Sequence, residues 1–265
     1  MALFVSRGKR MKIEMHAESK TYPIYLERGI LKKAKEYIGR SGKVFLISDD
    51  GVPEQWRNLL QKQYPSASMY VFKNGEASKN FDTLQDILKA MQKAHVSRKD
   101  SVIALGGGVV GDMAGFASAI YMRGIPYINI PTTSLSQIDS SIGGKNCVGA
   151  FWQPDMVLVD PEVLTTLTPR HFHNGLAEAV KEGLIKDEKL FEIFERDDYA
   201  DHIDEIIARC LNIKKNVVEH DEKETGERKL LNFGHTYGHG LESYFGMDGY
   251  YHGECVGLGM LKILN

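Results

Sequence analysis

Histidine and glutamate residues at helical spacing are the side chains of this chain best suited to chemistry. His235 and His239 stand four residues apart in the run FGHTYGH, His252 and Glu254 stand in YHGE, and Glu178 stands in GLAEAVK. Residues four apart share one face of a helix. Two imidazoles and one carboxylate around an open position are typical of a catalytic zinc site. The pattern predicts Glu178, His235 and His252 as ligands, with His239 or Glu254 as alternatives, although such histidine pairs also occur without a metal.

Three glycines accompany the histidine pair. Gly234, Gly238 and Gly240 would each cost a helix roughly 1 kcal/mol relative to alanine. That cost is easier to understand where another group approaches the backbone closely. We therefore expect close packing against this segment.

A second candidate site is the glycine-rich run ALGGGVVGD. It follows an apolar run at 101–105, which we expect to be a buried strand, and precedes an expected helix at 113–119. Gly106, Gly108 and Gly111 have the G-x-G-x-x-G spacing of dinucleotide sites, where N–H groups at a helix start bind phosphate. The alternative is a glycine turn that only packs strand against helix.

The usual ribose-binding acid is absent after these glycines. It is expected about 20 residues later, but the corresponding segment at 129–131 is Asn-Ile-Pro. Asp49 and Asp50 end an earlier expected strand, at the edge where ligands of open α/β sheets bind. These two acids are our candidates for holding the adenosine end of a dinucleotide.

The surrounding pattern predicts an α/β fold followed by helices. Up to about residue 160, strand-like runs, which alternate apolar and polar residues or are rich in β-branched residues, take turns with segments whose apolar residues have helical spacing. Later residues show helical spacing only, as in 201–218. We expect a Rossmann-like α/β domain at 1–162, with a mostly parallel, doubly wound sheet, and an all-α domain at 163–265. The expected strands are 11–15, 22–26, 43–48, 69–72, 101–105, 127–130 and 156–159, and the first helices are 29–38, 52–63, 81–94 and 113–119.

Composition excludes several classes of protein. Of 265 residues, 43% are hydrophobic and 26% charged, and the net charge of −2 gives no reason to expect nucleic-acid or membrane partners. Cys147, Cys210 and Cys255 are scattered, which suits a reducing cytoplasm and excludes a thiolate zinc cluster. The apolar helical run 256–264 reaches the last residues, so we expect the physical protein to be longer.

Basic residues near the candidate sites suggest an anionic substrate. Each alone is more simply explained as a solvated surface charge, but together they suit a carboxylate or phosphate, which arginine binds in a bidentate manner. They are Arg123, Lys145, Lys181, Lys214 and Arg228.

Longer motifs carry a family resemblance from about residue 43 onward. The runs GGGVVGDMAGF, YMRG, PTTSLSQIDSSIGGK, GAFWQP, GLAEAVKEGLI, LLNFGHTYGH and HGE stand in the order found in 3-dehydroquinate synthases, within the sugar-phosphate cyclase group. The chain resembles that family. The resemblance implies NAD, a divalent metal (zinc or cobalt), a homodimer and a place in the shikimate pathway.

The implied reaction makes 3-dehydroquinate and phosphate from 3-deoxy-D-arabino-heptulosonate 7-phosphate. It comprises NAD-dependent oxidation, phosphate elimination, re-reduction, ring opening and intramolecular aldol closure, so that NAD is regenerated in each turnover.

The resemblance also implies roles for individual residues. It assigns the metal to Glu178, His235 and His252, and proton transfer or phosphate contact to His239. The implied substrate-binding residues are Lys145, Lys181, Lys214, Arg228, Asn232, Asp139 and Arg123, the last acting across a dimer interface. The implied NAD-binding residues are Asp49, Glu76, Lys79, Gly107, Gly108, Asp112, Thr132, Thr133, Asp139 and Lys145.

Two departures from the family pattern bear on these roles. Lys145 runs straight into Asn146, where the family has a longer loop, and the family continues past residue 265.

The alternatives to a 3-dehydroquinate synthase are a cyclase acting on another sugar phosphate, a metal-dependent polyol dehydrogenase, or an inactive binding remnant. Cyclases with inosose or valiolone products change the residues matching four positions, and all four fit the dehydroquinate pattern here: Lys214, Arg228, Asn232 and His239.

Overall fold

The structure, a computed structural model, describes residues 10–39, 42–146, 149–246 and 249–265. By their internal contacts the described residues form two compact units. One comprises 10–132 with 140–166, and the other comprises 133–139 with 167–265. Cys147 lies outside the described residues, whereas Cys210 and Cys255 are buried and free.

The first unit contains a seven-stranded sheet in the order β1-β2-β9-β6-β5-β3-β4. All neighbours pair in parallel except β1 and β2. The expected α/β fold with a mostly parallel sheet is thus confirmed. The strands are β1 (Met11–His16), β2 (Thr21–Leu26), β3 (Val44–Asp49), β4 (Ser68–Phe72), β5 (Ser101–Gly106), β6 (Tyr127–Pro131) and β9 (Met156–Val159), and β7 (Lys145–Asn146) pairs with β8 (Ala150–Phe151) in a separate two-stranded ladder.

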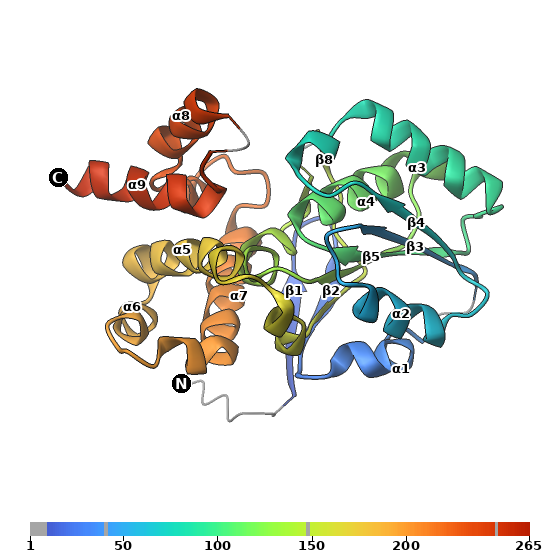
Figure 1. The fold of residues 1–265 in the computed structure, drawn as a ribbon, viewed down its shortest axis with the longest axis horizontal. Helices are drawn as coiled ribbons and strands as arrows, with labels where there is room; N and C mark the ends of the chain where they lie inside the picture. Colours follow the sequence, from blue (N-terminus) through green and yellow to red (C-terminus); the bar gives the residue numbers. More distant parts are fainter. Residues whose placement is uncertain (1–9, 40–41, 147–148, 247–248) are drawn as a thin grey trace. The chain divides into compact units, whose positions relative to one another are not determined.

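Helices cover both faces of the sheet because successive strand residues point to opposite faces. Phe45 and Ile47 join one apolar cluster with α3 and α4, whereas Leu46 joins another with α1 and α2. Figure 1 shows these two helix pairs on opposite sides of the sheet. The helices are α1 (Ala34–Ile38), α2 (Glu54–Gln63), α3 (Phe81–Lys93) and α4 (Gly108–Ile120), with 3-10 helices at Ile30–Lys33, Glu76–Ser78, Tyr121–Arg123 and Pro161–Thr166.

The glycine loop differs from the sequence expectation in one respect. Helix α4 begins at Gly108 rather than at residue 113, so the glycines form its first turn. A Cβ at Gly106 would lie 2.3 Å from Val110 Cγ2, and one at Gly115 would lie 2.5 Å from Asn146 Oδ1. Close packing therefore explains Gly106 of the loop, and Gly115 further along α4, without a ligand.

The second unit is helical throughout its described residues. It contains α5 (Pro169–Lys186), α6 (Glu188–Phe194), α7 (Ile203–His220), α8 (His235–Phe245) and α9 (His252–Leu264), with 3-10 helices at Tyr199–His202 and Glu227–Asn232 and a π-helix at Ser136–Ser140. The Thr168 hydroxyl accepts the His171 N–H and caps α5, and Pro169 occupies its first position. Helix α5 packs against α6, α7 and α9.

Glycines allow α8 and α9 to approach each other closely. A Cβ on Gly259 would lie 2.0 Å from the Gly234 carbonyl oxygen, and one on Gly238 would lie 3.2 Å from Val256 Cα. The expected close approach at Gly234 and Gly238 is therefore found, and α9 supplies it. Gly240 has open space around it instead.

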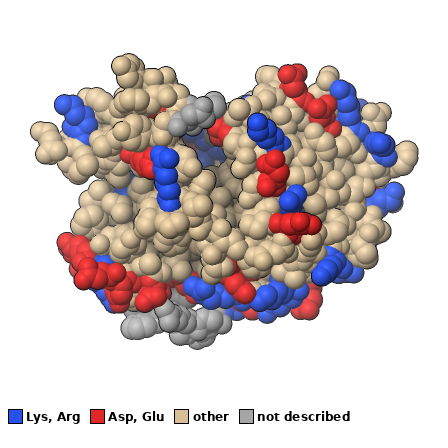
Figure 2. Space-filling view, viewed as in Figure 1, with Lys and Arg blue, Asp and Glu red and all other residues tan. Residues whose placement is uncertain are grey.

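Charged side chains of both signs are spread over the surface. On the face drawn in Figure 2, acidic side chains gather over α6 and the segment after it, which carries Glu195, Asp197 and Asp198. Arg196 pairs with Asp198 at 2.8 Å. Among the described residues, no helix is both long enough and apolar enough to cross a membrane.

The contact between α8 and α9 predicts a contrast between two glycines of α9. Gly259→Ala is expected to lower the free energy of unfolding by about 1–3 kcal/mol, because the new methyl group meets the backbone of α8. Gly257→Ala is the matched control. It meets open space and is expected to be neutral or to stabilise by up to about 1 kcal/mol. Urea unfolding of both variants tests this, and equal stability would contradict the packing argument.

Candidate active site

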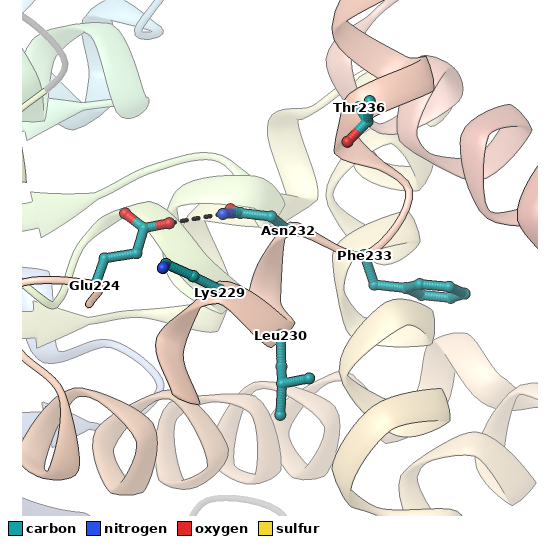
Figure 3. A pocket seen from close by; sticks show the side chains of 6 residues that line it. All are labelled: Glu224, Lys229, Leu230, Asn232, Phe233 and Thr236. Atoms are coloured by element: carbon teal, nitrogen blue, oxygen red, sulfur yellow. Dashed lines mark hydrogen bonds between the residues drawn. The ribbon is translucent and has the colours of Figure 1, made fainter. Parts of the chain in front are cut away.

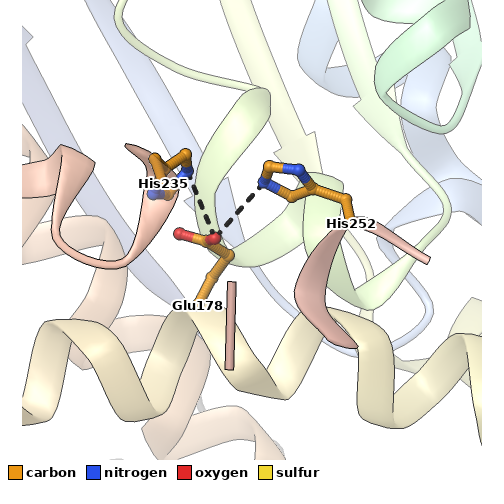
Figure 4. A group of neighbouring side chains, drawn as sticks. All are labelled: Glu178, His235 and His252. Carbon is orange, nitrogen blue, oxygen red and sulfur yellow. Dashed lines mark ion pairs between the residues drawn. The ribbon is translucent and has the colours of Figure 1, made fainter. Parts of the chain in front are cut away.

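Three helices bring Glu178, His235 and His252 together. Glu178 lies in the middle of α5, and the histidines are the first residues of α8 and α9. Glu178 Oε1 lies 3.6 Å from His235 Nε2 and 3.4 Å from His252 Nε2, and Figure 4 shows both rings turned toward this oxygen. One donor atom from each residue falls within 4.8 Å of the others. These are the three ligands that the sequence pattern favoured.

Local backbone geometry places the two histidines. Gly234 precedes α8 with a left-handed φ of 82°, a conformation that glycine adopts without strain. At the start of α9, the Gly253 N–H donates to Asn174 Oδ1 at 2.7 Å. Asn174 lies one turn before Glu178 on α5, so this bond holds His252 beside the carboxylate.

The Glu178 carboxylate is buried but only half satisfied. Its side chain is 1% exposed, Oε2 accepts from Lys181, and Oε1 has no hydrogen-bond partner. Burial disfavours the charged form, but the positive charge of Lys181, together with the contacts to His252 and His235, outweighs it and lowers the pKa of Glu178. An ionised oxygen left open between two imidazole nitrogens is suited to a divalent cation. The donor set therefore fits zinc or cobalt.

The two imidazoles respond differently to their surroundings. Burial disfavours the charge on His252, but the neighbouring carboxylates of Glu178 and Glu242, at 3.4 Å and 2.9 Å, outweigh burial and raise its pKa to about 9. Burial lowers the pKa of His235, and the charge of Glu178 offsets this only in part. The difference follows from the second carboxylate, Glu242, which contacts His252.

The two alternative ligands have other partners. His239 is largely exposed and lies in a second cluster of His239, Glu242 and His252, where its Nδ1 is 2.7 Å from Glu242 Oε2. Glu254 forms a bidentate pair with Arg170, with both bonds at 2.7 Å, and accepts the N–H of Tyr251 at 2.8 Å. Glu254 therefore caps α9 and belongs to neither cluster found among the described residues.

Two lysines and three acids, one of them Glu178, form a largely buried group of charges. Lys214 Nζ lies 2.7 Å from Asp139 Oδ1 and donates to the Asp139 carbonyl oxygen at 2.7 Å. Burial opposes ionisation of Asp139, but the charges of Lys214 and Lys181 outweigh it and hold its pKa well below the usual range. Glu182 is fully buried, and burial together with the Asp139 charge raises its pKa well above the usual range. With Glu182 neutral, the two positive charges of Lys181 and Lys214 balance the two negative charges of Asp139 and Glu178.

A pocket of about 550 Å³ lies beside the segment that leads into α8 (Figure 3). Glu224 Oε1 accepts from the Asn232 side chain at 2.7 Å, and Figure 3 shows Lys229 beside this pair. Glu224 has a left-handed φ of 60°, which is unusual for a residue with a side chain. Sequence reasoning selected Asn232 but missed Glu224, because nothing in the local sequence distinguishes this acid from its charged neighbours. The pocket is lined by Glu224, Lys229, Leu230, Asn232, Phe233 and Thr236.

Arg228 is anchored by the turn that precedes it. Its backbone N–H donates to Asp221 Oδ2 at 3.0 Å, and its guanidinium Nη1 donates to the Glu222 carbonyl oxygen at 2.6 Å. Asp221 also accepts the N–H groups of Thr225 at 2.8 Å and Gly226 at 2.7 Å. The turn thus fixes a buried guanidinium.

In the α/β unit, three of the expected NAD-binding residues form one ion-pair group. Lys79 Nζ lies 2.7 Å from Glu76 Oε1 and 3.1 Å from Asp112 Oδ2. Asp49 ends β3, and its carboxylate accepts the N–H groups of Gly51 and Val52. Their contact with NAD stays a prediction.

The remaining predicted residues lie as follows. Gly107 and Gly108 begin α4, and the Thr132 N–H donates to the Gly106 carbonyl oxygen at 2.9 Å, beyond the end of β6. In the helical unit, Thr133 bonds to Ser136. Lys145 is exposed on β7, and Arg123 is exposed with a left-handed φ of 66°.

Comparison with known proteins identifies the family. Residues 69–174 match the family model of the 3-dehydroquinate synthase N-terminal part, and residues 175–265 match that of the C-terminal part. The chain belongs to the 3-dehydroquinate synthase family. The resemblance carried by the sequence motifs is therefore confirmed.

Individual relatives agree with this family. The 3-dehydroquinate synthase of Clostridium acetobutylicum is 45% identical, over 95% of this chain and 76% of that protein. A 2-deoxy-scyllo-inosose synthase solved with carbaglucose-6-phosphate, NAD+ and Co2+ aligns with a TM-score of 0.86 and 26% identity, over 95% of this chain and 75% of that one. The 2-epi-5-epi-valiolone synthase of Streptomyces hygroscopicus, solved with NAD+ and Zn2+, aligns with a TM-score of 0.81 and 27% identity, over 92% of this chain and 74% of that one.

The turn that anchors Arg228 predicts a pH-dependent stability. Burial opposes ionisation of Asp221, but the N–H groups of Thr225, Gly226 and Arg228 together outweigh it and lower its pKa from 3.8 to about 2. Because the folded pKa is depressed, the contribution of Asp221 is fully present above pH 3.8 and is lost as the pH falls through about 2. Asp221→Asn should therefore be less stable than wild type at pH 7, and the difference should shrink across this window.

Urea unfolding of wild type and Asp221→Asn at several pH values measures this difference. A difference that stays constant between pH 5 and the lowest pH at which both chains fold would show that ionised Asp221 does not hold the turn.

Proposed function

We propose that this chain is a 3-dehydroquinate synthase that converts 3-deoxy-D-arabino-heptulosonate 7-phosphate to 3-dehydroquinate and phosphate in the shikimate pathway. One structural observation carries the proposal: the buried, unpartnered Glu178 Oε1 that faces Nε2 of His235 and of His252. This donor set stands in a chain that is 45% identical to a protein named for that activity.

Glu178, His235 and His252 would hold a zinc or cobalt ion. When bound, the ion supplies a Lewis acid that polarises the hydroxyl to be oxidised. The neighbouring Lys181 neutralises part of the charge of Glu178 and fixes its second oxygen. His239 is exposed next to this centre and suits proton transfer or contact with the phosphate.

The polar residues of the helical unit supply the contacts to an anionic substrate. Lys214 is held by Asp139, Arg228 is fixed by its turn, and Asn232 lines the pocket of Figure 3. Cations and amide groups fixed in this way bind a carboxylate, a phosphate or a hydroxyl without first losing side-chain freedom. We assign Lys145 and Arg123 to the same substrate, Arg123 across the interface of a homodimer.

NAD is assigned to the α/β part of the chain. When bound, NAD accepts a hydride from the substrate and returns it in the same turnover. The residues that would bind it are Asp49, Glu76, Lys79, Gly107, Gly108, Asp112, Thr132, Thr133, Asp139 and Lys145. The proposal includes a division of labour between 1–162, for NAD, and 163–265, for metal and substrate, in a cytoplasmic enzyme without nucleic-acid or membrane partners.

Two observations favour this substrate over those of other cyclases. The inosose and valiolone synthases are 26% and 27% identical to this chain, against 45% for the dehydroquinate synthase. The four positions that distinguish cyclase substrates, Lys214, Arg228, Asn232 and His239, also fit the dehydroquinate pattern. A polyol dehydrogenase would differ in another way, because it would release NADH.

Release of inorganic phosphate from the heptulosonate phosphate tests the function. With NAD present, we expect release that chelation abolishes and zinc restores, without accumulation of NADH. Accumulation of NADH would indicate a dehydrogenase. Absence of phosphate release, from protein of verified length with bound NAD and metal, would reject the dehydroquinate assignment.

Substitution of the predicted ligand tests the metal centre. Glu178→Gln should reduce zinc affinity by more than the roughly 10–100-fold that is lost when a hydrogen-bond partner of a metal ligand is changed. Glu254→Gln, the alternative ligand that pairs with Arg170, should keep the affinity of wild type. Competition with a chromogenic chelator measures both, and the reverse order would make Glu254 the ligand.

A further inference from the structure

One carboxylate, Glu242, contacts two of the three imidazoles of His235, His239 and His252. It lies on α8, three residues after His239, and its side chain is 30% exposed. Glu242 Oε2 is 2.7 Å from Nδ1 of His239, and Glu242 Oε1 is 2.9 Å from Nδ1 of His252. Sequence reasoning did not select this residue, although it lies on the same helix as the histidine pair.

These two contacts fix which nitrogen of each ring carries hydrogen. An ionised carboxylate only accepts hydrogen bonds, and each oxygen of Glu242 lies within hydrogen-bond distance of one Nδ1 atom. Both Nδ1 atoms must therefore be donors. When a cation replaces the second ring proton of His252, the nitrogen left to bind it is Nε2, which faces Glu178 Oε1 at 3.4 Å.

The third imidazole, that of His235, has the same orientation, but its Nδ1 bonds to a weaker acceptor. Nδ1 of His235 lies 3.3 Å from the carbonyl oxygen of Phe233, and its Nε2 faces Glu178. Each predicted metal-binding histidine thus has Nδ1 bound to an acceptor and Nε2 directed toward the buried carboxylate. A carboxylate in this position is the stronger acceptor, because its hydrogen bond is charge-assisted.

We propose that Glu242 is the positioning residue of this site, orienting His252 as a metal ligand and His239 as a proton acceptor through one shared carboxylate. The inference rests on the proposed function, since it takes His252 as a ligand of the metal. Partners of this kind raise the basicity of the ligand and fix its orientation. Because both rings share one carboxylate, a shift of His252 is transmitted to His239.

A second cation held by His239, Glu242 and His252 is the competing explanation for the same cluster. It would require both Nδ1 atoms to be free of hydrogen, whereas their distances to Glu242 are those of ordinary hydrogen bonds. It predicts two zinc ions per chain, whereas the positioning role predicts one.

Zinc affinity of Glu242→Gln, measured on the purified full chain, is the first test. The amide oxygen can still accept from one ring, but the amide nitrogen then meets the hydrogen on the other Nδ1. Zinc affinity should fall about 10–100-fold, and the visible spectrum of the Co2+-loaded protein should change because His252 is turned. Glu205→Gln is the matched control. Its side chain is 28% exposed and also lies near an imidazole, at 3.9 Å from His202, and it should leave both readouts unchanged.

The outcomes separate the inference from the proposed function. Wild-type zinc affinity and an unchanged Co2+ spectrum in Glu242→Gln would overturn the inference and leave the synthase proposal intact. Binding of two zinc ions by wild type would overturn the inference in favour of the second site. Failure of wild type to bind zinc, together with absence of phosphate release, would reject both.

If Glu242→Gln does not fold, nitrogen NMR of the zinc-loaded wild type tests the inference by detecting which ring nitrogens carry hydrogen. Zinc-bound His252 should show a protonated, hydrogen-bonded Nδ1, and His239 should show the tautomer protonated at Nδ1. A His239 ring protonated only at Nε2, or a His252 ring with zinc at Nδ1, would overturn the inference.

Discussion

The buried carboxylate of Glu178 is the group on which the helical unit depends. A carboxylate without solvent is costly unless its oxygens are paired, and Lys181 pairs only one of them. The other oxygen requires a cation or hydrogen-bond donors, and the first residues of α8 and α9 supply two imidazoles. The requirement of one buried atom thus links three helices that are far apart in sequence.

The surrounding charges follow from the same constraint. Lys181 and Lys214 are balanced by Glu178 and Asp139, and Glu182 is kept neutral by burial and by the nearby Asp139 charge. Such a group is stable only when its charges are paired, because an uncompensated buried charge would cost several kcal/mol. The proposed substrate-binding lysines are therefore held in place by the interactions that make their burial possible.

Close contacts between backbones position both units internally. In the α/β unit, glycines let β5 meet α4, and in the helical unit they let α8 meet α9. A side chain at Gly259 would separate the helices that carry His235 and His252. Glycine has two roles here, since it also allows the left-handed turn at Gly234 that begins α8.

The alternating α/β pattern, the later all-helical segment and the family can be predicted from the sequence alone, because hydrophobic periodicity and long motifs are local signals. The sequence also selected Glu178, His235 and His252 through their residue types and spacing. Only the tertiary structure placed β1 antiparallel at the sheet edge, began α4 at Gly108, and joined Glu254 to Arg170. It also decided the role of Glu242, whose contact with His252 crosses from α8 to α9. That contact depends on how closely two helices pack, which no spacing within either helix can specify.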